Sequence, residues 1–189
     1  MQRESEAFFL GIAPDRRLGP PLRALTYMLL VSAFFMAEPS IETAEDEAAR
    51  FAFVRKLMDE HIPFNRVLGL RVRHIARGTA VLEIPFRPEL IGDSDRPALH
   101  GGVVSALADT CGGAAAWTQV GAQDRVSTID LRVDYLRPGR AETVVATGHV
   151  LRVGNRVAVV NVVVTHDGDA EPIAEAKGVY AIKRVGGMR

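Results

Sequence analysis

The run Leu99–Trp117 constrains the fold of this chain more than any other segment, because almost every side chain in it is apolar or small. An α-helix of this composition has no polar face to present to solvent, so it belongs in the middle of a core. One carboxylate, Asp109, nevertheless lies within the run, and His100-Gly101-Gly102 stands near its start. A buried carboxylate costs several kcal/mol unless a partner or a reaction uses it. We therefore expect a buried central helix with Asp109 as the first candidate functional residue.

Segments of alternating apolar and polar residues on both sides of this run predict strands joined by tight turns. Two strands are expected before it and four after it, at 70–76, 79–85, 127–136, 142–153, 156–166 and 173–185. A helix is predicted from Thr43 until Pro63 ends it, with connectors at 64–70 and 87–97. This order favours an α+β fold in which a curved antiparallel sheet surrounds the central helix. Because one helix cannot cover both faces of such a sheet, we also expect an oligomer.

The first forty residues differ from the rest of the chain and offer no candidate chemistry. A basic segment precedes an apolar run at 24–37, which is shorter than the roughly 20 residues that a membrane-spanning helix needs. Three interpretations stay open: a signal-like segment or anchor, an ordinary extra helix, or an upstream extension before a native start at Met36. We divide the chain into this extension, 1–40, and a domain, 41–189. A cytoplasmic location is expected, with membrane association only if 24–37 anchors the chain.

Charge and cysteine content exclude several classes of function. The 23 basic and 23 acidic side chains leave no net charge, which argues against a nucleic-acid partner or an anionic membrane surface. The single cysteine, Cys111, allows neither an intrachain disulfide nor a cysteine zinc cage. The five histidines are scattered without metal-ligand spacing. We therefore expect neither a metal nor a cofactor.

Three motifs occur in a fixed order along the second half of the chain. His100-Gly101-Gly102 is followed by Leu107-Ala108-Asp109-Thr110, and then by a strand of pattern T-x-D-x-x-x-x-Y-L-R-P at 128–138. Together they resemble the PaaI-like acyl-CoA thioesterases of the hotdog fold over residues 51–185. The resemblance implies a five- or six-stranded antiparallel sheet wrapped around a long central helix. It also implies a homodimer or homotetramer that hydrolyses an acyl-CoA thioester to a free acid and CoA.

The spacing of Gly101 and Asp109 bears on how such a site is built. Eight residues at 1.5 Å each separate them by about 12 Å along the helix, too far to act on one reacting atom within one subunit. The resemblance implies a site between two subunits. Gly101 of one helix then offers its amide N–H to the thioester oxygen, and Asp109 of the other acts as general base or as nucleophile. The sequence leaves the choice between these two roles open.

The resemblance assigns further residues to the same site. His100 positions the thioester or the loop, and Thr128 helps to orient water or the carboxylate. Ser94 stands where the family commonly has asparagine, and its side chain is shorter and lacks the amide group. The CoA of the substrate is expected near the helix start and near arginines at turns, namely Gly102, Arg137, Arg152 and Arg156.

Two alternative functions of this domain remain open at this point. One is a hotdog acyl-CoA hydratase or dehydratase, although its D-x-N-x-x-H pattern is absent from the chain. The other is a non-catalytic acyl-CoA-binding sensor, which needs an output module. The first forty residues show no recognition helix for such a module.

Overall fold

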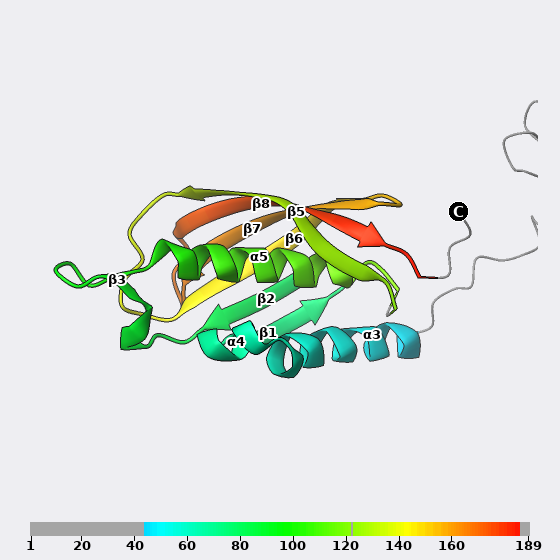
Figure 1. Ribbon diagram of the computed structural model, residues 1–189, viewed down its shortest axis with the longest axis horizontal. Helices are drawn as coiled ribbons and strands as arrows, with labels where there is room; N and C mark the ends of the chain where they lie inside the picture. Colours follow the sequence, from blue (N-terminus) through cyan, green and yellow to red (C-terminus); the bar gives the residue numbers. More distant parts are fainter. Residues whose placement is uncertain (1–43, 122, 186–189) are drawn as a thin grey trace, which may run out of the picture. The chain divides into compact units, whose positions relative to one another are not determined.

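The computed structural model describes residues 44–121 and 123–185 (Figure 1). These belong to a unit that begins at Ala44, and the preceding unit, Met1–Thr43, lies outside the described residues. The predictions for 1–40, including the run at 24–37 and the start at Met36, therefore fall on a part that is not described. Along the described residues, no helix has the length and apolar content needed to cross a membrane.

The helices before the sheet differ in part from the prediction. α3 (Ala44–Lys56) continues into a π-helical turn, η1 (Leu57–His61), as expected for one helix ending near Pro63. Residues 64–70 were predicted as a connector, and this is wrong, because α4 (Pro63–Leu68) occupies most of them. Pro63 starts this helix, since the fixed φ of proline suits the first helical turn. Gly69 ends it in the left-handed conformation, at φ 69°.

The strands follow the prediction closely. Six of them form one antiparallel sheet in the order β1-β2-β6-β7-β8-β5, which confirms the α+β class and the strand number. Their bounds are β1 Arg71–Ala76, β2 Thr79–Ile84, β5 Arg125–Tyr135, β6 Val144–Val153, β7 Val157–His166 and β8 Pro172–Lys183. The connector predicted at 87–97 instead contains a 3-10 turn, η2 (Pro88–Leu90), and β3 (Ile91–Asp93), which forms a small hairpin with β4 (Ala98–Leu99) just after it.

The predicted central helix is α5 (Gly101–Trp117), and the sheet curves around it (Figure 1). Its packed face includes Leu107, Ala108 and Cys111, all fully buried. Burying a side chain of the size of Leu107 contributes about 1.5–3 kcal/mol, so this face anchors the helix to the sheet. A second stripe, Ser105, Asp109, Thr110, Gly113 and Trp117, is only partly buried. The helix is therefore covered on most sides but not on all.

The two edges of the sheet differ in whether their backbone groups are free to pair with another strand. At the β1 edge, Arg55 of α3 donates to the Val72 carbonyl at 2.7 Å, and the Val72 N–H donates to Asp59 Oδ1 at 2.8 Å. These side chains occupy backbone groups that another strand would need. At the β5 edge, no described strand pairs with the side away from β8, and Ile129 is 60% exposed. An open, eleven-residue edge strand is a ready surface for pairing with another chain.

Candidate active site

The start of α5 leaves one backbone donor free. His100 caps the helix, and its Nδ1 accepts from the Gly102 N–H at 2.9 Å. The Val103 N–H donates to the His100 carbonyl at 2.9 Å. Among the described residues, no group accepts from the Gly101 N–H. The positive end of the helix dipole is thus presented through this single amide.

Two hydroxyl groups hold the carbonyl that follows this amide. Tyr135, the last residue of β5, donates from its hydroxyl to the Gly101 carbonyl at 3.1 Å. Ser105 donates to the same oxygen at 3.0 Å from one turn further along α5. The two hydroxyls also contact each other. The backbone around Gly101 is therefore fixed although glycine itself imposes no conformation.

The two glycines at this point differ in what requires them. A Cβ on Gly101 would meet the Tyr135 ring at 3.4–3.5 Å, an ordinary van der Waals contact. A Cβ on Gly102 would lie 2.8 Å from His100 Nδ1, which is too close. Gly102 is thus required by the capping histidine, whereas the described packing does not require glycine at position 101. This leaves room for another molecule to approach the Gly101 backbone.

Asp109 lies on the partly buried stripe of α5, so the expectation of a deeply buried carboxylate is wrong. Its Oδ1 accepts from the Thr128 hydroxyl at 2.8 Å, which brings together two of the predicted site residues. Thr128 stands on β5 beside a register shift between Thr128 and Asp130, and a bulge of this kind redirects side chains.

Tyr180 of β8 holds the backbone of α5 at Asp109. It is the register partner of Thr128, and its hydroxyl donates to the Asp109 backbone carbonyl at 3.0 Å. Burial, followed by the Asp109 charge, raises the pKa of Tyr180 well above its usual range. The phenol therefore stays a neutral donor that holds this turn of α5.

The lone cysteine plays no part in this arrangement. Cys111 is fully buried, and its thiol donates to the Ala80 and Ala146 carbonyls at 3.4 Å. Burial raises the pKa of the Cys111 thiol to about 12, so a nucleophilic thiolate is not available there. Within the described residues, no cluster of three His, Cys, Asp or Glu side chains could hold a metal ion.

Gly101 and Asp109 line separate pockets. The first pocket, of about 300 Å³, lies at the helix start and is lined by Gly101, Tyr135 and Arg137, together with Leu99, Val104, Leu136, Pro138, Gly139 and Ile173. The second, of about 190 Å³, contains Asp109 and Thr128 and is walled by Met58, Ile62, Phe64, Asn65, Thr110, Gly113, Trp117, Val126, Ser127 and Tyr180. One chain therefore carries the free Gly101 amide and the Asp109 carboxylate in two different places.

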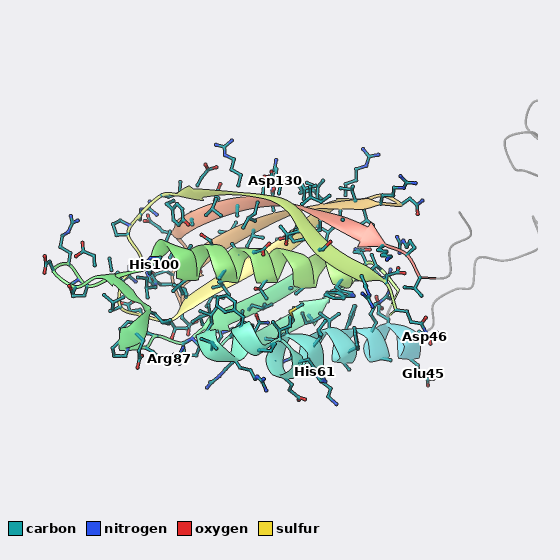
Figure 2. The ribbon with its side chains drawn as sticks, viewed as in Figure 1. Glu45, Asp46, His61, Arg87, His100 and Asp130 are labelled. Carbon is teal, nitrogen blue, oxygen red and sulfur yellow. The ribbon has the colours of Figure 1, made fainter. Side chains whose placement is uncertain are left out.

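Two of the predicted residues near the helix start have different surroundings. Ser94 is exposed in the turn between β3 and β4 and makes no described contact with Asp109. Figure 2 shows His100 where this hairpin meets α5. Arg137 lines the Gly101 pocket, but it already pairs with Glu171 at 3.0 Å and donates to the Pro172 carbonyl at 2.9 Å.

The other two predicted arginines lie at the far end of α5. The Gly78 N–H donates to Thr118, the C-cap of this helix, at 2.7 Å, and the Val150 N–H donates to the Gly78 carbonyl at 2.8 Å. Arg152 follows on the same strand, and Arg156 lies just past the hairpin turn. The structure does not bring either of them to Gly101 or to Asp109 in this chain.

Three residues of the site were not predicted from the sequence: Ser105, Tyr135 and Tyr180. Ser105 could have been found from its position four residues after Gly101, which places the two on one helix face. Tyr135 stands inside the strand motif, but its contact with Gly101 joins residues 34 positions apart. Tyr180 carries no local signal, since it is one apolar position among several in β8.

Comparisons with known proteins agree on one family. The family model described as the thioesterase superfamily matches residues 97–173. A medium/long-chain acyl-CoA thioesterase, YigI, of Salmonella typhimurium is 37% identical over 138 residues, covering 65% of this chain and 86% of the relative. YigI of Escherichia coli K12 is 36% identical over the same shares. A crystal structure from Shewanella oneidensis, related to the thioesterase superfamily, has a TM-score of 0.66 and 34% identity, covering 71% of this chain and 96% of that one.

Proposed function

This chain belongs to the thioesterase superfamily, and from that premise we propose that it hydrolyses acyl-CoA thioesters. Water adds to the thioester carbonyl, the C–S bond breaks, and the products are a free carboxylic acid and the CoA thiol. One observation carries this proposal: the same helix bears both a Gly101 N–H without an acceptor among the described residues and an Asp109 carboxylate that Thr128 holds in place. A cytoplasmic location, expected from the sequence after Met36, is part of the proposal.

The proposed roles follow from the chemistry of each group. The Gly101 N–H, at the positive end of α5, stabilises the negative charge that develops on the thioester oxygen. Thr128 donates to Oδ1 of Asp109, and the other carboxylate oxygen is the one that takes part in the reaction. That oxygen either removes a proton from water as a general base or attacks the carbonyl carbon as a nucleophile. His100 and Gly102 shape the approach to the Gly101 amide, and Arg137, which lines the same pocket, is the arginine proposed to meet a CoA phosphate.

The proposed active unit contains two copies of the chain. Gly101 and Asp109 are about 12 Å apart along one helix, so one chain cannot present both to a single carbonyl group. The open β5 edge carries Thr128 and Tyr135, and the β1 edge is occupied by Arg55 and Asp59. Antiparallel pairing of two β5 edges is therefore the favoured contact, and it brings α5 of one copy towards α5 of the other. A tetramer made from two such dimers is compatible with the same site.

The pocket beside Asp109 is the proposed place for the acyl chain. Met58, Ile62, Phe64 and Trp117 supply apolar wall, and Asp109 and Thr128 supply the polar groups. Two relatives are named for medium- and long-chain acyl-CoA, and a chain of this kind suits an apolar pocket. Each methylene that enters it should raise kcat/KM by about fourfold, since burial of one CH₂ contributes about 0.8 kcal/mol.

Hydrolysis of a straight-chain acyl-CoA panel, from acetyl to palmitoyl, tests the proposal. Wild type should release free CoA with a preference for the longer chains, and Asp109→Asn should lose at least 100-fold in kcat on every substrate, an order-of-magnitude expectation for a general base. Asp130→Asn is the matched control, because Asp130 is an exposed acid on the same strand as Thr128 (Figure 2). Binding of acyl-CoA without turnover by wild type would favour a sensor instead. Full activity of Asp109→Asn would contradict the mechanism.

A further inference from the structure

The peptide unit between Gly101 and Gly102 is held at both of its ends. Its carbonyl oxygen accepts from Tyr135 at 3.1 Å and from Ser105 at 3.0 Å. Its N–H donates to His100 Nδ1 at 2.9 Å. A peptide between two glycines has the greatest rotational freedom of any, so these contacts replace a restraint that side chains normally provide.

The protons in this cluster can be counted. Two hydroxyl groups carry two protons, but the two hydroxyls and the Gly101 oxygen make three contacts with one another. Two protons serve at most two of these contacts at one time, so either both hydroxyls donate to the carbonyl, or one donates to the carbonyl and the other donates to that first hydroxyl. In each arrangement both hydroxyls polarise the Gly101 carbonyl, either by donating to it directly or by strengthening the hydrogen bond that the other hydroxyl donates.

The opposite end of the same peptide determines the state of His100. A ring nitrogen that accepts a hydrogen bond carries no proton, so the neutral imidazole carries its proton on Nε2. A hydrogen bond at the carbonyl makes the N–H of the same peptide a stronger donor, which reinforces its bond to Nδ1. His100 is exposed, and none of the described residues contacts its Nε2 through a hydrogen bond.

We propose that Tyr135 and Ser105 are positioning residues that act through the Gly101–Gly102 peptide on His100. They keep the imidazole in the Nε2–H tautomer and keep the Gly101 amide in place. The start of α5 then offers two donors to an incoming carbonyl oxygen, the Gly101 N–H and the His100 Nε2–H. The catalytic consequence rests on the proposed thioester hydrolysis, whereas the effect on His100 does not.

The tautomer of His100 can be read from long-range ¹H–¹⁵N NMR spectra of the imidazole rings. The chain has five histidines, so the signals of His100 are assigned by their loss in His100→Ala. Wild type should show the Nε2–H form alone, and the double variant Tyr135→Phe, Ser105→Ala should show a mixture of both forms. Tyr135→Phe with Ser105→Thr keeps one hydroxyl and should restore the wild-type signals. Thr147→Val, which removes a hydroxyl from β6 away from this cluster, should leave them unchanged.

Kinetics supply the second readout. The double variant should lose about tenfold in kcat with little change in KM, because misplaced donors weaken transition-state binding more than substrate binding. A wild-type spectrum with the proton on Nδ1 would overturn the proposal, and so would a double variant that keeps both the wild-type tautomer and the wild-type kcat. If wild type hydrolyses no acyl-CoA but the tautomer changes as expected, the proposed function fails while the control of His100 by the two hydroxyls stands.

Discussion

Two glycines of helix α5, Gly101 in its first half and Gly112 in its second, serve opposite purposes. In the first half, Gly101 has space for a Cβ and an N–H without an acceptor among the described residues. In the second half, a Cβ on Gly112 would lie 2.1 Å from the Tyr180 hydroxyl, inside the core. The first glycine leaves the backbone open to another molecule, whereas the second lets a strand side chain approach the helix. The same residue type therefore marks a candidate site at one end and close packing at the other.

The largest effect is expected from Gly101→Pro, which removes the amide proton and closes a three-carbon ring on the backbone nitrogen. Proline is well tolerated at the first helical position, and His100 has the extended conformation, φ −63° and ψ 129°, that the residue before proline needs. Loss of one oxyanion donor should reduce kcat about 100- to 1,000-fold. Acyl-CoA hydrolysis measures this, and urea unfolding should show stability within about 1 kcal/mol of wild type.

Gly101→Ala is the matched control for this variant, since it adds a Cβ but keeps the N–H. It should retain much more activity than the proline variant. Equal losses in the two variants would show that added volume matters and that the amide does not.

Substitution of Gly112, in the second half of the helix, should lower the free energy of unfolding and leave the catalytic steps unchanged. Gly112→Ala places a methyl group against Tyr180, which is only 1% exposed and cannot move aside. Overpacking of this kind costs about 1–3 kcal/mol, measured as a lower urea midpoint with an unchanged m-value. Gly113→Ala is the control, because its Cβ would meet Tyr180 at an ordinary 3.6 Å. An unchanged urea midpoint in Gly112→Ala would show that packing against Tyr180 does not require glycine at position 112.

A smaller effect on stability is expected at Asp124, in the loop that joins α5 to β5. Its carboxylate accepts from Val185 at 3.0 Å, Arg184 at 2.7 Å and Gly121 at 2.9 Å. Burial opposes ionisation of Asp124, but these three donors outweigh it and lower its pKa below the ordinary 3.8. Asp124→Asn should therefore lose about 1–2 kcal/mol of unfolding free energy at neutral pH.

The pH dependence of this loss has a definite sign. A carboxylate whose pKa is lower in the folded state stabilises the protein above the unfolded pKa, and this stabilisation disappears as pH falls through the folded pKa. The stability gap between wild type and Asp124→Asn should thus be constant near neutrality and shrink below about pH 4. A gap that stays the same in acid would show that the ionised form of Asp124 does not anchor this end of the helix.

Much of the fold was predictable because its signals are local. The apolar run predicts α5, and alternating apolar and polar residues predict the six long strands, because each pattern depends only on neighbouring positions. Helix α4 was missed because Pro63 was interpreted as a stop, although proline also starts helices and Gly69 provides the real end. The hairpin of β3 and β4 is too short for an alternating pattern to be recognised.

The candidate site was predictable only where it lies on one element. The spacing of Gly101 and Asp109 follows from helix geometry, and the structure keeps it. The exposure of Asp109 could not be predicted, because it depends on which stripe of α5 the sheet leaves uncovered. The contacts of Asp109 with Thr128 and of Gly101 with Tyr135 depend on the position of β5 and on its bulge, which long-range pairing determines. The catalytic roles of these residues stay predictions.

The central claim is that Gly101 and Asp109 work together from two different chains. Mixing Gly101→Pro chains with Asp109→Asn chains, by co-expression or subunit exchange, tests it most directly. Random pairing makes half of the dimers mixed, and each mixed dimer has one intact site of two, so about a quarter of wild-type activity should return. If the mixture is no more active than the two variants measured separately, Gly101 and Asp109 do not form a shared site and the account is contradicted.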